Sequence, residues 1–118
     1  MANPNIAALS NVYGTTNVVS SVSTGGSTVI SSVPASTVYK VDTVTAANKT
    51  GTAATITLYV TRSAVNYNIA YQITVPANAT LVLIGKDSII YMNESDVLTA
   101  VAGTGSAIDI VAAYEAIS

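Results

Sequence analysis

The chain has 118 residues, of which half are apolar and only 8% are charged, with a formal net charge of −2 and no Cys or His. This length is sufficient for one domain with a hydrophobic core. The composition excludes disulfides, a zinc site of Cys and His ligands, and catalysis by a Cys nucleophile or a His base. The four basic residues are spread along the chain, so no nucleic-acid footprint is predicted.

The first third of the chain is uncharged, because Met1 to Tyr39 contain no Asp, Glu, Lys or Arg. No secretory signal is readable at the N-terminus, and no apolar run approaches the roughly 20 residues of a membrane helix. We therefore expect a soluble product that is made in the cytoplasm and has no membrane contact. So few charges on so apolar a chain also favour a subunit whose surface is covered in an assembly.

The uncharged stretch "SNVYGTTNVVSSVSTGGSTVISSVPASTVY" has two interpretations. It supplies one or two edge strands to the domain that follows, or residues 1–36 are an extended arm that orders on a neighbouring subunit. We adopt the arm, since it contains no charge whose burial would require a partner. Tyr13 is then a candidate anchor in a partner's pocket. The predicted partner-contact residues are Tyr13, Val18, Val19, Val22, Val29 and Ile30.

The clearest strand after this segment is "AATITLYVTR", in which apolar and Thr or Tyr residues alternate with a period of two. The run "STVYKVDTVTA" precedes it, and "NKTG" between them is typical of a turn, which predicts a hairpin. "NYNIAYQITV" follows as the next strand. Its predicted common face consists of Ile69, Tyr71, Ile73 and Val75.

Four more strand-like runs complete the chain: "TLVLIG", "SIIYM", "DVLTAVAG" and "AIDIVAAYEAI". In the last run Ile108, Ile110, Ala112 and Tyr114 share a face, and the "GTGS" before it reads as a hairpin turn. Short strands at this spacing predict an all-β fold, an antiparallel β-sandwich of about seven strands over residues 37–118. A jelly-roll-like and an immunoglobulin-like topology both fit.

Candidate chemistry is limited to the carboxylates in "KDSIIYMNESD", namely Asp87, Glu94 and Asp96. Such a cluster could bind calcium or act as a catalytic pair. Loops between strands also carry acids for solubility, and we favour that interpretation. The sequence therefore predicts no enzyme, no cofactor and no metal. The seven Tyr residues are expected to replace the missing Phe and Trp at the edge of the core.

From Thr37 onward the chain resembles a family of small virion proteins of tailed bacteriophages, notably those of cyanobacteria and marine bacteria. The shared features are an ordered series of short motifs, and where the family's acidic turn often has Gly this chain has Ser95. The motifs are Val75-Pro76-Ala77, Thr80-Leu81-Val82, Lys86-Asp87, Tyr91, Glu94 to Asp96, and Tyr114-Glu115 with Ile117.

The resemblance implies a structural protein, with the strongest parallel to capsid cement (decoration) proteins. These are β-sandwiches on the outside of the capsid shell, often homotrimers, whose arm clamps neighbouring capsomers. Such a protein would be made in the host cytoplasm and end on the virion surface, with the major capsid protein and copies of itself, as a trimer or a dimer, as partners. Two alternatives remain open: another virion component at the neck, tail or fibre, and a module whose Tyr residues bind host glycans.

Overall fold

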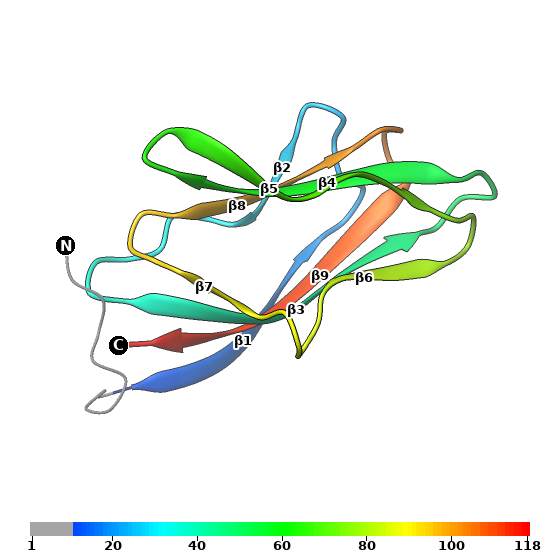
Figure 1. Cartoon of the computed structure of the whole chain (residues 1–118). Helices are drawn as coiled ribbons and strands as arrows, with labels where there is room; N and C mark the ends of the chain where they lie inside the picture. Colours follow the sequence, from blue (N-terminus) through cyan, green and yellow to red (C-terminus); the bar gives the residue numbers. More distant parts are fainter. Residues whose placement is uncertain (1–10) are drawn as a thin grey trace.

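The computed structural model describes residues 11–118, and these form two antiparallel β-sheets stacked face to face (Figure 1). One sheet, here called sheet A, has the strand order β1-β9-β3-β6, with the short β7 also paired to β3. The other, sheet B, has the order β2-β8-β4-β5. Of the described residues, none forms a helix long and apolar enough to cross a membrane. The strands are β1 (Val12–Val19), β2 (Ser27–Ile30), β3 (Val38–Asn48), β4 (Ala54–Arg62), β5 (Val65–Val75), β6 (Thr80–Ile84), β7 (Ile90–Met92), β8 (Val97–Ala102) and β9 (Ile108–Ile117).

In most strand pairs the first half of the chain pairs with the second half in reverse, and the β3–β9 and β4–β8 pairs then join these pairs into two sheets. β1 pairs with β9, β2 with β8, β3 with β6 and β7, and β4 with β5. The chain is thus one long hairpin, with its tip between β4 and β5, folded over into two sheets. This is the topology of a jelly roll. The predicted antiparallel sandwich is confirmed, and residues 37–118 contain seven strands, β3 to β9.

The core lies between the sheets and consists of aliphatic side chains, because the chain has no Phe or Trp. Along β9, Ile108, Ile110, Ala112 and Tyr114 all point inward, as their alternation predicted.

The rings of Tyr39 and Tyr114 lie 4.7 Å apart and close one part of this core. Burial raises the pKa of the Tyr114 hydroxyl, which donates to Asn17 Oδ1 at 3.2 Å. The expected role of Tyr as a substitute core aromatic is confirmed for these two residues.

The described part of the predicted N-terminal arm belongs to the sandwich of its own chain. β1 pairs with β9 along its whole length, and β2 pairs with β8. Asn17 ties the two strands together, since its Nδ2 donates to the carbonyl oxygen of Val29 at 3.0 Å. The boundary at residue 37 is therefore wrong for residues 12–36, and the edge-strand interpretation is the correct one there. Residues 1–10 of the predicted arm lie outside the described residues.

Both predicted hairpins are wrong, because their turns connect the two sheets. "NKTG" leads from β3 in sheet A to β4 in sheet B, and "GTGS" leads from β8 in sheet B to β9 in sheet A. The buried Asn48 fixes the first crossing by donating to the carbonyl oxygens of Thr52 and Val75 and accepting from the N–H and hydroxyl of Thr50. At the second crossing, a Cβ on Gly103 would collide with the Thr55 hydroxyl, so this close approach requires glycine.

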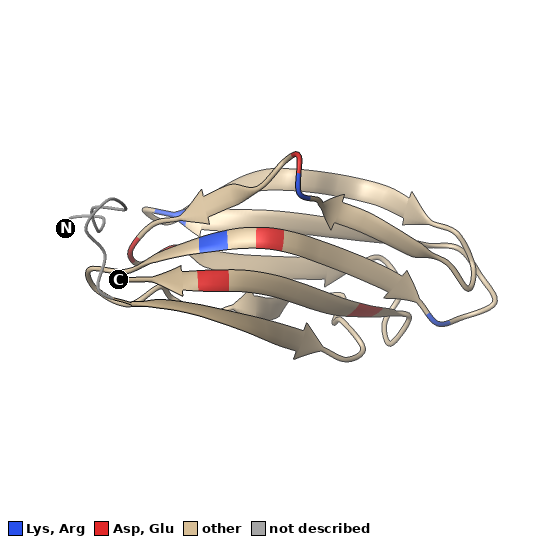
Figure 2. Ribbon diagram, turned by 90° about the horizontal axis from the view of Figure 1, so that it is seen from below, with Lys and Arg blue, Asp and Glu red and all other residues tan. Residues whose placement is uncertain are grey.

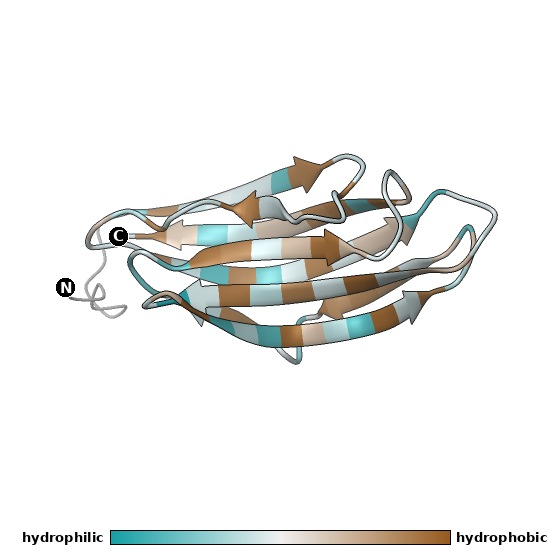
Figure 3. Ribbon diagram, turned by 90° about the horizontal axis from the view of Figure 1, so that it is seen from above, coloured by the Kyte–Doolittle hydropathy of each residue, from teal (hydrophilic) through white to brown (hydrophobic). Residues whose placement is uncertain are grey.

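The common face predicted for β5 is also interrupted. Its register with β4 shifts between Ile56 and Leu58, and Gln72 has a positive φ of 48°. Such a bulge breaks the alternation of side chains along a strand. Ile73 and Val75 keep a common face opposite Ile56 and Ala54 of β4, whereas Tyr71, which is 62% exposed, is separated from them by the bulge. Along β4, by contrast, apolar and polar residues alternate (Figure 3), and along β8 buried residues alternate with partly exposed ones.

Candidate functional site

The three candidate carboxylates do not form a common site. Asp96 is buried and accepts hydrogen bonds at both oxygens from the Arg62 guanidinium, with Nε–Oδ1 and Nε–Oδ2 distances of 3.0 and 3.1 Å. It also accepts from the backbone N–H of Asn93 at 2.9 Å. Glu94 accepts from the N–H of Ser36, and Asp87 lies in the loop between β6 and β7. Asp96 is therefore a structural residue rather than part of a solvated turn.

No cation site is assembled from these side chains. Within residues 11–118 there is no group of three or more His, Cys, Asp or Glu residues placed to bind a metal ion. Every buried side-chain nitrogen or oxygen in the same part of the chain has a hydrogen-bond partner.

The outer face of sheet A carries a row of exposed aliphatic side chains. Val18 on β1 lies opposite Val111 on β9, Val111 opposite Thr45 on β3, and Thr45 opposite Val82 on β6. Directly opposed residues in antiparallel strands point to the same face of a sheet. Val18, Val82 and Val111 are 71%, 59% and 43% exposed, and we call this row the valine face.

Of the two rows of residues that flank the valine face, one is uncharged and the other contains Asp109. The uncharged row, two residues further along the strands, consists of Thr16, Ala113 and Thr43. Figure 2 shows the charges of sheet A in the first half of β3, just beyond the end of β3 and near both ends of β9, with an uncharged stretch between them. A partner that covers only this stretch would bury no charge.

The charges at both ends of the face are already paired. At one end Lys40 lies 3.5 Å from Glu115 and 3.7 Å from Asp42. Their carboxylates, Glu115 foremost, raise the pKa of the Lys40 ammonium. At the other end Asp109 accepts from the N–H of Ser21 at 2.8 Å and from Lys49 Nζ at 2.9 Å. These two bonds, the backbone one foremost, hold the pKa of the Asp109 carboxyl below its ordinary value.

The predicted partner-contact residues divide into two groups. Tyr13 and Val18 are exposed, at 63% and 71%, and Val19 is partly buried against the core. The other three are buried in the core of their own chain, so their assignment to a partner interface is wrong. The physical reason is that β2 and the segment before it complete the sandwich and fill its interior. These residues are Val22, Val29 and Ile30.

Sequence reasoning missed the other two residues of the valine face. Val111 alternates with the predicted common face of its strand, Ile108, Ile110, Ala112 and Tyr114, and this pattern does not distinguish a contact residue from a solvated one. Val82 lay in a run that reads as entirely apolar, "TLVLI", in which its outward direction is invisible. Only the register of four strands distant in sequence brings them beside Val18. No single-strand pattern carries that information.

Comparison with known proteins gives no relative from which a role could be transferred. No protein-family model matches the chain, and no curated protein matches its sequence.

Proposed function

We propose that the chain is a capsid cement (decoration) protein of a tailed bacteriophage. It binds the outer surface of the assembled major capsid shell, bridges neighbouring capsomers and catalyses no reaction. Its copies associate with one another on the shell, as trimers or as dimers. The support comes from the sequence resemblance of residues 37–118 and from one structural observation, the uncharged valine face.

The valine face carries the proposal because covering it is favourable and costs little. Burial of an exposed Val contributes about 1.5–3 kcal/mol when it is complete. Scaled by the exposed fractions of Val18, Val82 and Val111, the three side chains together contribute about 3 kcal/mol for each copy that binds. The charged groups at its ends remain paired with each other, so docking leaves no buried charge without a partner.

A modest free energy per copy is sufficient for a cement protein. A ligand that binds only the assembled shell, and not free subunits, stabilises the shell in proportion to its occupancy. Many copies act on one particle, so small contributions sum over the whole shell. The fold is compatible with this role, because jelly rolls occur in viral capsid domains, but they also occur in lectins. The fold alone therefore does not choose between the cement protein and the glycan-binding alternative.

The experiment is reconstitution with empty shells of the encoding phage that lack this protein. Purified protein is mixed with the shells and, separately, with dissociated major capsid protein, and binding is measured by co-sedimentation. We expect saturable binding to shells at a fixed copy number, none to dissociated subunits, and a higher temperature of shell disruption. Protein that stays in the supernatant, or that is present in only a few copies per virion, would contradict the proposal and favour a neck, tail or fibre component.

A further inference from the structure

β5 is the longest edge strand of the described sandwich, with eleven residues against eight in β1, which is uncharged as well. Exposed edge strands can pair with other chains, and proteins usually protect them by short length, charge or proline. β5 has eleven residues, Val65–Val75, and contains neither a charged residue nor a proline. By contrast β2, the other edge of the same sheet, has four residues. β5 is also exposed along most of its length, and its register with β4 shifts twice, once near Gln72 and once near Ile69.

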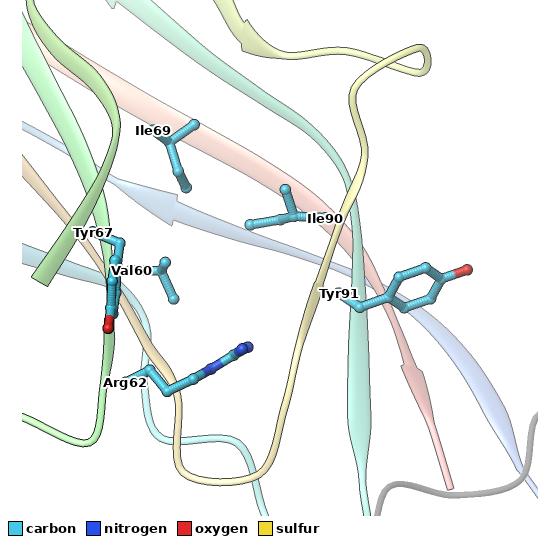
Figure 4. A pocket seen from close by; sticks show the side chains of 6 residues that line it. All are labelled: Val60, Arg62, Tyr67, Ile69, Ile90 and Tyr91. Carbon is cyan, nitrogen blue, oxygen red and sulfur yellow. The ribbon is translucent and has the colours of Figure 1, made fainter. Parts of the chain in front are cut away.

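A pocket of about 280 Å³ opens beside this edge, between the two sheets. Tyr67 and Ile69 from β5, Val60 and Arg62 from β4, and Ile90 and Tyr91 from β7 line it. In Figure 4, Val60, Ile69 and Ile90 point into the space between β5 and β7, with Tyr67 beside them and the Arg62 side chain crossing below. The volume is just below the roughly 300–1,000 Å³ typical of ligand pockets, which suits a single side chain or ring.

The electrostatics of the pocket favour an uncharged occupant. The positive charge of Arg62 is compensated by Asp96, which accepts from Nε and from Nη2. The same pairing holds the guanidinium in place at the rim. Because β5 itself carries no charge, the edge and the pocket together are neutral, and a charged group placed there would lose hydration without gaining a partner.

We infer that β5 and this pocket bind an extended, uncharged polypeptide segment of a partner protein. The segment pairs with the free edge of β5 as an added strand and inserts one aliphatic or aromatic side chain between Tyr67 and Ile90. In this mode of recognition the backbone hydrogen bonds supply affinity and the pocket supplies specificity. The inference does not depend on the proposed function, since it concerns sheet B and not the valine face.

A peptide fits the site better than a saccharide does. A sugar would need polar side chains for its hydroxyl groups, but three of the six lining residues are aliphatic. Two nitrogens of Arg62 are already bonded to Asp96. An extended peptide instead satisfies its polar groups on the backbone edge of β5 and needs only an apolar pocket for one side chain.

The test uses a fluorescent heptapeptide, acetyl-Thr-Val-Thr-Phe-Thr-Val-Thr-amide, titrated against the full-length protein. Binding is followed by fluorescence anisotropy, and the site is located by amide chemical shifts in NMR spectra. We expect saturable binding, shifts concentrated in β5 and β7, and loss of binding when alternate peptide nitrogens are methylated. Replacing both Val residues of the peptide by Glu should also abolish binding.

Matched variants separate this site from other surfaces. Tyr67→Lys places a charge at the edge of β5 and should weaken binding at least tenfold. Tyr13→Lys makes the same change at a similarly exposed Tyr of β1, 63% against 55%, and should leave binding unchanged. Three results would overturn the inference: no saturable binding, chemical shifts confined to β1 or β2, or equal loss in both variants. Saturable binding of maltohexaose that Tyr67→Lys removes, with none of the peptide, would assign the pocket to saccharides instead.

Discussion

Placing a negative charge on the valine face should abolish shell binding without unfolding the protein. The variant is Val18→Asp together with Val82→Asp, on the two edge strands of sheet A. Both side chains are mostly exposed, at 71% and 59%, so the isolated fold loses little core contact. We expect the free energy of unfolding to fall by no more than about 1 kcal/mol, largely from the poor strand propensity of Asp.

The effect on shell binding should be much larger. The two substitutions remove the burial of two valines, about 2 kcal/mol in total after scaling by their exposed fractions. They also bury two carboxylates without partners, at a cost of at least about 1 kcal/mol each. The sum of about 4 kcal/mol corresponds to a dissociation constant roughly a thousandfold weaker.

The assay is co-sedimentation with empty shells over a range of protein concentrations, accompanied by urea denaturation of the free protein. The matched control is Thr28→Asp, which adds the same charge at an exposed position of β2 in sheet B. The control should bind shells like the unaltered protein. If the double variant binds shells with unchanged affinity while remaining folded, the valine face does not contact the shell and the reasoning is refuted.

Four further changes test the fold that supports this face, each by urea denaturation. Asp96→Ala should lower the free energy of unfolding by about 2–3 kcal/mol, because it removes the buried partner of Arg62, and an unchanged midpoint would contradict this. The lowered pKa of the Asp109 carboxyl stabilises the fold above its unfolded pKa of about 3.9, so stability should fall as the pH drops below about 4, and Asp109→Asn should reduce that fall. Ala64→Gly should stabilise the fold by about 0.5–1 kcal/mol, since Ala64 has a φ of 62°. Deletion of residues 1–33 should unfold the domain, and a soluble, folded product would show that β1 and β2 are dispensable.

The strands themselves were predictable, because residues that face a core alternate with residues that face solvent. All seven runs from residue 37 onward became strands, and the inward face of β9 was correct residue by residue. This alternation is a local property of each strand, so it can be recognised without knowing which strands pair with each other. Bulges were not predictable, and the one near Gln72 shifted the face of β5.

Strand partners were not predictable from turn chemistry. The turn with Gly and Asn between β3 and β4 satisfies the usual hairpin pattern, yet it crosses between the sheets. The hairpin that does exist joins β4 to β5 through Ser63 and Ala64, both with positive φ of 53° and 62°. That geometry usually selects Asn or Gly, so the residues gave no sign of it. The residues of a turn determine the local backbone conformation, but they do not determine which sheet the next strand joins.

The N-terminal segment shows a different limit. Its Val and Ile content and its lack of charge indicated correctly that residues such as Val22 and Ile30 face protein. Burial by a neighbouring subunit and burial in the same chain require the same residue types, so the sequence could not distinguish them. The strand pairing distinguishes them, because β8 and β9 would each lose one of their two partner strands without β2 and β1.

The most direct test of the central claim is a cryo-electron microscopy reconstruction of shells saturated with the protein. We predict density for the jelly roll on the outer surface, at sites between capsomers, with the outer face of sheet A against the shell. Val18, Val82 and Val111 should then lie in the contact. Density at the neck or tail, or contact through sheet B with the valine face open to solvent, would contradict the account.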